Sequence, residues 1–100
     1  MAEIIPLHPS RPEPLWREAA GDVLRRTRHE RGERLADTAE RSGVSPQYLS
    51  EMERGLKEPS SEMLAAVAGA LDLSLIDLAS AVADDLREAV PTRGALLLAA

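Results

Sequence analysis

Four polar side chains between residues 46 and 54 have the types and the spacing to contact DNA. Intervals of three and four residues place them on one face of a helix. They are Gln47, Ser50, Glu51 and Arg54. An amide can pair with N6 and N7 of adenine, and a carboxylate can accept a hydrogen bond from N4 of cytosine. A guanidinium beside them suits a phosphate oxygen, so the group indicates contact with double-stranded DNA.

Catalysis and metal binding have no comparable pattern in the sequence. The chain has no cysteine, and its two histidines, His8 and His29, are far apart. A zinc site needs three or four converging ligands. Acidic residues alternate with arginines as on solvated helix faces, and no nucleophile stands with a base and an orienting group. We therefore expect no catalytic residue, no metal, no cofactor and no enzymatic activity.

The polar face needs a short, well-positioned helix, and the sequence supplies its start. The Ser45 hydroxyl can cap free N–H groups, and Pro46 fits the first helical position, where its missing donor costs nothing. A preceding helix over 35–42 would end at Gly43, which can adopt the positive φ of a tight turn. Two short helices joined in this way form a helix-turn-helix, whose second helix fits the major groove of DNA.

The rest of the chain predicts an all-α protein. Sixteen alanines and fifteen leucines, with only two aromatic residues, favour closely packed helices over strands. We expect five helices, at about 15–31, 35–42, 46–54, 61–71 and 75–90. They form one domain over 15–90, between a proline-rich arm (1–14) and a short tail (91–100). A domain of this size buries little area, which favours a dimer.

The net charge of −5 is unevenly distributed along the chain. Residues 1–57 carry ten basic and ten acidic side chains, whereas residues 58–100 carry two and seven. A cationic face toward phosphates is therefore possible in the first part, because binding depends on local potential.

No apolar run approaches the ~18 residues of a membrane span, and the first residues lack a signal-peptide pattern. We expect a cytoplasmic protein, at the nucleoid when bound to DNA, with no membrane partner.

Nearly half of the sequence resembles the xenobiotic-response-element (XRE) family, the relatives of phage repressor and Cro. The matching run, from Leu24 to Leu71, is LRRTRHERGERLADTAERSGVSPQYLSEMERGLKEPSSEMLAAVAGAL. Within the family it is most similar to the ClgR/PopR branch, regulators of Clp protease genes in actinobacteria. That closer similarity lies in GDVLRR from Gly21, in YLSEMERGLKEPSSEML, and in Ala99 and Ala100.

The resemblance implies a five-helix, phage-repressor-like domain with a longer C-terminal helix, acting as a homodimer on a roughly palindromic operator. The base-reading positions would be Pro46, Gln47, Ser50 and Glu51. The phosphate-facing positions would be Arg34, Ser45, Tyr48, Arg54, Lys57 and Ser60. The family's internal ion pair would join Arg28 to Glu53. Arg34-Leu35 departs from the Thr-Gln pair of many members, and Thr38 stands where a larger aliphatic residue is usual.

Several of these positions have a plainer alternative. Gln47 could be an exposed glutamine in water, although its place after the Ser-Pro cap favours a base contact. Glu51 could accept a hydrogen bond from cytosine, or it could orient Arg54 three residues later. Tyr48 could donate to a phosphate or serve packing alone. The arginine run of the first helix is best interpreted as a solvated face; it consists of Arg25, Arg26, Arg28 and Arg31.

The C-terminal part carries two further predictions. Leu78, Val82 and Leu86 recur at helical spacing, and we expect them in a two-fold dimer interface; the alternative is a helix packed only on its own domain. Ala99 and Ala100 follow three leucines and resemble the endings read by Clp-type proteases, so they could form a degron that makes Clp protease a partner. The alternative is an added dimer contact or a disordered end.

The sequence as a whole predicts a dimeric, sequence-specific transcription regulator on an inverted repeat in double-stranded DNA, and the family resemblance implies Clp protease genes as its targets. The alternative is an antitoxin-like or accessory module that uses the same fold to hold another protein.

Overall fold

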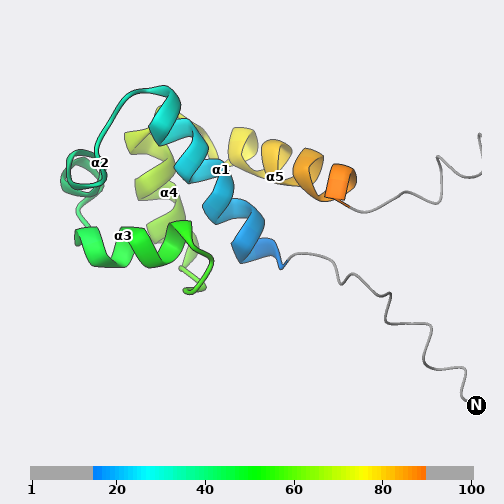
Figure 1. Cartoon of the computed structure of the whole chain (residues 1–100), viewed down its shortest axis with the longest axis horizontal. Coiled ribbons are helices and arrows are strands. Elements are labelled where there is room, and N and C mark those ends of the chain that lie inside the picture. Colours follow the sequence, from blue (N-terminus) through cyan, green and yellow to red (C-terminus); the bar gives the residue numbers. More distant parts are fainter. Residues whose placement is uncertain (1–14, 90–100) are drawn as a thin grey trace, which may run out of the picture.

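The computed structural model describes residues 15–89, and these form five helices and no strand (Figure 1). The helices are α1 (Trp16–Glu30), α2 (Leu35–Ser42), α3 (Pro46–Glu53), α4 (Ser61–Ala70) and α5 (Leu75–Ala89). Every helix begins and ends within one residue of its expected bounds, so the all-α prediction is confirmed. None of these helices taken singly is long and apolar enough to cross a membrane. The expectations for residues 1–14 and 90–100, including the degron at Ala99 and Ala100, lie outside the described residues.

The helices begin and end where local side-chain chemistry dictates. The Ser45 hydroxyl accepts a hydrogen bond from the backbone N–H of Tyr48 at 3.0 Å and thereby caps α3. The Ser60 hydroxyl caps α4 in the same way through Met63 N–H at 3.2 Å. Gly43 ends α2 with a φ of 77°, which turns the chain sharply toward α3.

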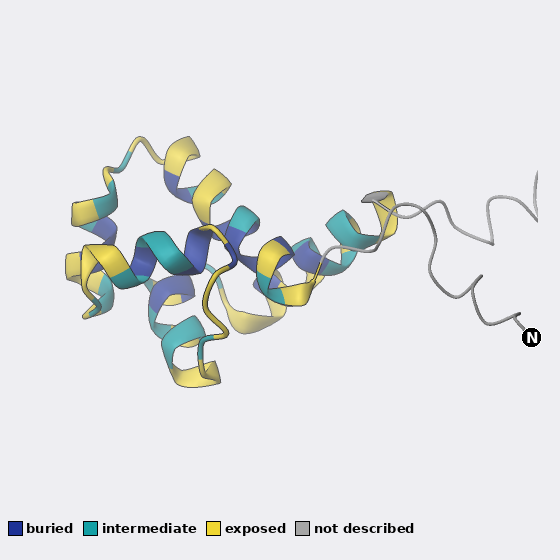
Figure 2. Ribbon diagram, turned by 60° about the horizontal axis from the view of Figure 1, so that its bottom comes forward, coloured by how far each residue is buried: buried dark blue, intermediate teal, exposed yellow. Residues whose placement is uncertain are grey.

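The core lies where α1 packs against α3 and α5 while α2 packs against α3 and α4 (Figure 2). Its largest fully buried apolar side chains are Leu24, Leu49, Met52, Val67, Leu78 and Val82. Small residues, among them Ala20, Ala39 and Ala68, let the helix backbones approach closely.

The prediction that Leu78 and Val82 form dimer contacts is wrong, because both side chains belong to the core of a single chain. Their side chains are 1% and 0% exposed within a single chain, because this stripe of α5 covers its own domain. Leu86, the third residue of the stripe, is half-buried and packs against the same core. The alternative of a helix packed on its own domain therefore holds for Leu78 and Val82. Helical spacing identifies an apolar stripe, but it does not say which partner covers it.

Candidate nucleic-acid interface

α3 presents the residues that were predicted to read bases on the side opposite the core. Pro46 and Gln47 are exposed at its first turn, and Ser50 and Glu51 are half-buried one turn later. On its other side Leu49 and Met52 are buried, which anchors the helix. The four predicted base-reading side chains therefore share one accessible edge of a fixed helix. Such a helix can enter the major groove with its N-terminal residues toward the bases.

The predicted phosphate-facing residues lie at helix ends and in the loop after α3. Ser45 and Ser60 are the N-caps of α3 and α4, so each lies beside free backbone N–H groups that attract anions. Arg34 precedes α2, is 87% exposed at its side chain, and pairs with Asp37 at 3.4 Å. Lys57 lies in the loop between α3 and α4.

The structure joins Glu51 to Lys57 rather than to Arg54. Lys57 Nζ lies 3.6 Å from Glu51 Oε1 and 5.8 Å from the centre of the Tyr48 ring. Arg54 is exposed and forms no ion pair within residues 15–89. The interpretation of Glu51 as the orienting partner of Arg54 is therefore wrong for this structure, and Arg54 keeps its guanidinium free for an anion. The pair of Glu51 and Lys57 could not be predicted from spacing, because residues six apart are not neighbours on one helix.

An ion pair between α1 and α3 holds α3 in place. Arg28 Nε donates to Glu53 Oε2 at 2.7 Å, and Arg28 Nη2 donates to Glu53 Oε1 at 2.9 Å. The two residues are 8% and 7% exposed, and this is the pairing that the family resemblance implied. Hydrogen bonding to Glu53 raises the pKa of Arg28 further above its usual value. The pair thus serves as scaffold, since neither side chain reaches the accessible edge of α3.

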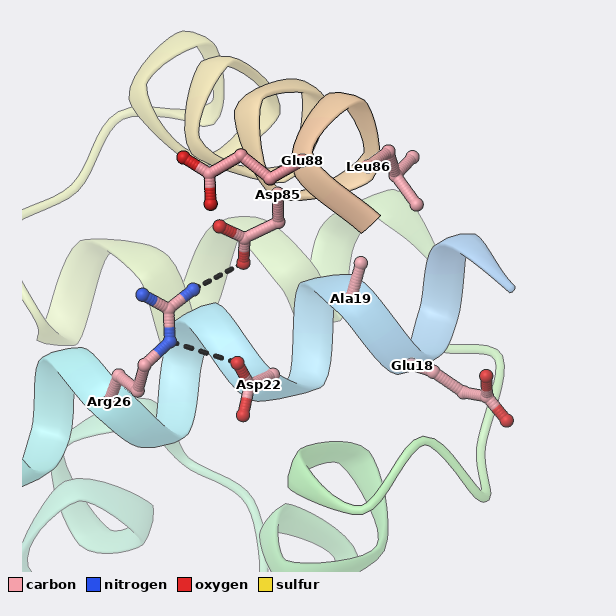
Figure 3. Close-up of a pocket in the computed structure, with 7 residues that line it drawn as sticks. All are labelled: Glu18, Ala19, Asp22, Arg26, Asp85, Leu86 and Glu88. Atoms are coloured by element: carbon pink, nitrogen blue, oxygen red, sulfur yellow. Dashed lines mark hydrogen bonds and ion pairs between the residues drawn. The ribbon is translucent and has the colours of Figure 1, made fainter. Parts of the chain in front are cut away.

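The arginine run of α1 is engaged within the domain. Arg25 and Arg26 pair with Asp22, and Arg26 also reaches Asp85 on α5 (Figure 3). A groove of about 490 Å³ lies here between α1 and α5. Its lining includes four acidic residues, Glu18, Asp22, Asp85 and Glu88. A surface of this charge is unsuited to DNA. Arg25, Arg26 and Arg31 are exposed, as the interpretation of a solvated helix face expects, but Arg28 of the same run is buried, and for that residue the interpretation is wrong.

A carboxylate that sequence reasoning missed ties α2 to its surroundings. Glu33 Oε1 accepts from the Thr38 hydroxyl at 2.6 Å and from Arg41 Nη2 at 2.7 Å, and Glu33 Oε2 accepts from Arg31 Nε at 2.9 Å. The hydrogen bond from Thr38, followed by those from the two arginines, lowers the pKa of Glu33 to about 2. Thr38 is fully buried, and its hydroxyl is used in this network. A threonine at an inward-facing helical position was the signal available in the sequence.

Low pH should destabilise the folded state, because it protonates the Glu33 carboxylate. An unfolded glutamate titrates near 4.5 and the folded one near 2, so the folded state binds the proton less well. The stabilisation is therefore complete above about pH 4.5 and is lost as the pH falls toward 2. We expect Glu33→Gln to lower the unfolding temperature at pH 7 and to approach wild type between pH 4.5 and 2. Thermal unfolding followed by circular dichroism measures both.

Glu40→Gln is the control for that experiment. It removes an exposed carboxylate from the same segment of chain, on α2. A gap between wild type and Glu33→Gln that keeps its size down to pH 2 would contradict the assignment.

Three comparisons with known proteins agree with this geometry. A helix-turn-helix family model, HTH_3, matches residues 24–78. The transcriptional regulator ClgR of Mycobacterium tuberculosis is 52% identical over 61 residues, which is 61% of this chain and 54% of that protein. SinR of Bacillus subtilis, an HTH-type transcriptional regulator, is 39% identical over 56 residues, 55% of this chain and 50% of that protein. The chain spans about half the length of these curated relatives.

A solved structure is similar over more of the chain. The crystal structure of the clp gene regulator ClgR from Corynebacterium glutamicum superposes with a TM-score of 0.72 at 52% identity. The match covers 75% of this chain and 80% of that one. The relatives named here are transcription regulators.

Proposed function

This chain belongs to the helix-turn-helix (XRE) family of DNA-binding transcription regulators, in its ClgR branch, and we propose that it acts as a homodimer on an inverted-repeat operator that controls Clp protease genes. The accessible polar edge of α3 is the observation that carries the proposal. Gln47 is exposed in the first turn of α3, two residues after the Ser45 cap, where its amide can reach a base. The link to Clp genes rests on the description of the relative as a clp gene regulator.

Affinity and specificity come from different residues in this proposal. Arg34, Arg54 and Lys57, together with the N-termini of α3 and α4, contact phosphates and provide most of the binding energy. Gln47, Ser50 and Glu51 contact base edges and provide the discrimination. Binding should therefore weaken steeply with salt, while base preference changes little.

Selection of duplex DNA by the purified full chain tests the proposal. Wild-type protein is incubated at low salt with fragments of the source genome and with random duplexes, and bound DNA is sequenced. We expect an enriched inverted repeat whose half-sites are about one helical turn apart, among fragments upstream of Clp protease genes. If folded protein enriches no sequence, the proposal fails and a protein-interaction module becomes the better account. An enriched repeat at other genes would contradict only the Clp assignment.

The dimer contact must use surface that remains exposed on one chain. On α5 the large apolar side chains of this kind are Leu75 and Ile76, which are 44% and 77% exposed. Burial of such residues between two copies would remove apolar surface from water and give the two-fold symmetry that an inverted repeat needs.

We therefore expect Ile76→Glu to weaken dimerisation at least about tenfold, because a carboxylate placed in an apolar contact loses its hydration. Sedimentation over a range of micromolar concentrations measures the monomer–dimer equilibrium. Leu56→Glu is the matched control, since it adds the same charge at a leucine that is 63% exposed in the loop after α3. Wild-type protein that stays monomeric, or an Ile76→Glu variant that dimerises as wild type does, would refute this contact.

A further inference from the structure

We propose that Lys57 is a positioning residue for base recognition, because its ammonium holds the Glu51 carboxylate for a hydrogen bond from cytosine N4. This inference rests on the proposed DNA binding. It assigns Lys57 a part in specificity, which a phosphate contact alone would not give.

The end of α3 is built so that Lys57 returns to the helix. The backbone N–H of Leu56 donates to the carbonyl of Glu51 at 2.9 Å, and Gly55 N–H donates to the carbonyl of Met52 at 3.1 Å. These two bonds form a Schellman turn, with Gly55 at φ 75°. The turn reverses the chain, so the residue that follows it lies beside the preceding helical turn.

Contacts from α1 fix this loop from the other side. Arg17 Nε donates to the carbonyl of Gly55 at 2.9 Å, and Arg17 Nη1 lies 3.5 Å from Glu58 Oε1. Bonds therefore hold the loop on both sides of Lys57, and the ammonium keeps its place over α3 without ordering a long free segment.

The ammonium lies between a carboxylate and an aromatic face. Lys57 Nζ is 3.6 Å from Glu51 Oε1 and 5.8 Å from the Tyr48 ring centre, which is within the range of a cation–π contact. Tyr48 is itself packed against the core. The Glu51 side chain is 25% exposed and that of Lys57 is 47% exposed, so DNA bound at α3 would remove further water from the pair.

Glu51 needs such a neighbour if α3 enters the major groove. A lone carboxylate there is repelled by the phosphates of both strands, and only a base that donates a hydrogen bond offsets the repulsion. Lys57 compensates the charge and fixes the orientation of the carboxylate. At 3.6 Å the contact with Glu51 is an ion pair and not a hydrogen bond, so the N–H donors of the ammonium stay available to a phosphate.

Arg54 provides the contrast on the same stretch of chain. It is exposed at the end of α3 and forms no ion pair within residues 15–89. Its loss should remove one phosphate contact and nothing else. Loss of Lys57 should also release Glu51.

Anisotropy titrations with the operator selected by wild-type protein, and with its single-base-pair substitutions, test the proposal. The variants are Lys57→Met, Glu51→Gln, both together, and Arg54→Met as control. We expect Glu51→Gln and Lys57→Met to change the base preference at the same base pair. The affinity of the double variant should differ about fivefold or more from the value expected if the two single effects were independent. Arg54→Met should weaken binding to all sequences alike. Lys57→Arg, which keeps the charge, should retain the preference of wild type.

Two outcomes would overturn the inference. Lys57 is a phosphate contact and nothing more if two results are found together. Lys57→Met weakens binding to all sequences by the same factor, as Arg54→Met does, and the loss of affinity in the double variant equals the product of the losses in Lys57→Met and Glu51→Gln. If wild-type protein selects an operator and the variants show this pattern, the proposed function stands and only the inference about Lys57 is refuted. A folded wild-type protein without any base preference refutes both.

Discussion

Glu53→Ala is expected to destabilise the domain by about 3–5 kcal/mol, close to the whole stability of a domain this small. The substitution leaves the Arg28 guanidinium, only 8% exposed, without the carboxylate that binds it at 2.7 and 2.9 Å. Arg28 would retain its bond to the carbonyl of Glu33 at 2.9 Å, which does not compensate its charge. Urea unfolding followed by circular dichroism measures the loss.

A double variant separates the cost of an unpaired charge from the value of the pair. Arg28→Met with Glu53→Leu removes both charges and fills similar volume, so it should be clearly more stable than Glu53→Ala. A Glu53→Ala variant within about 1 kcal/mol of wild type would contradict the account. Because Glu53 is on α3, its loss would also abolish DNA binding through unfolding, so binding data for this variant need a stability measurement beside them.

Gly21→Ala is expected to destabilise the domain by about 3 kcal/mol or more, at the upper end of overpacking effects. α1 crosses α3 at Gly21, and an added Cβ would lie 2.2 Å from the carbonyl oxygen of Met52 and 2.7 Å from that of Glu53. Both are backbone atoms of α3, so the methyl group fits only if the two helices move apart. Urea unfolding measures the change.

Gly69→Ala is the matched control, because a Cβ at this position in α4 meets nothing within 4 Å. It should stabilise the domain by about 0.5–1 kcal/mol, the usual gain in a helix. Opposite signs for the two glycines are the expected result. A small or stabilising effect of Gly21→Ala would show that the helices are less closely packed than the structure has them.

The helices could be predicted from the sequence because their ends are decided locally. Ser45 with Pro46, Ser60 and Gly43 act on backbone groups within three or four residues of themselves, and no distant contact is needed. The family resemblance added the pair of Arg28 and Glu53, which composition and spacing alone do not reveal.

What the sequence could not supply depends on contacts between distant segments. The stripe of Leu78 and Val82 fits a dimer interface as well as a core, and only packing against α1 and α4 decides between them. Lys57 meets Glu51 because a turn reverses the chain. Glu33 is bonded by Arg31 and Arg41 from both sides of its loop. Periodicity describes one element at a time, so it identifies none of these partners.

The placement of α3 in the major groove is tested most directly by Gln47→Ala. Affinities of wild type and variant are measured for the selected operator and for its substitutions at every base pair, after thermal unfolding shows equal stability. We expect the variant to lose about 1–3 kcal/mol of discrimination at one position of each half-site and to keep its preference elsewhere. A variant that binds every sequence as wild type does, or more weakly by one common factor, would contradict base reading by α3.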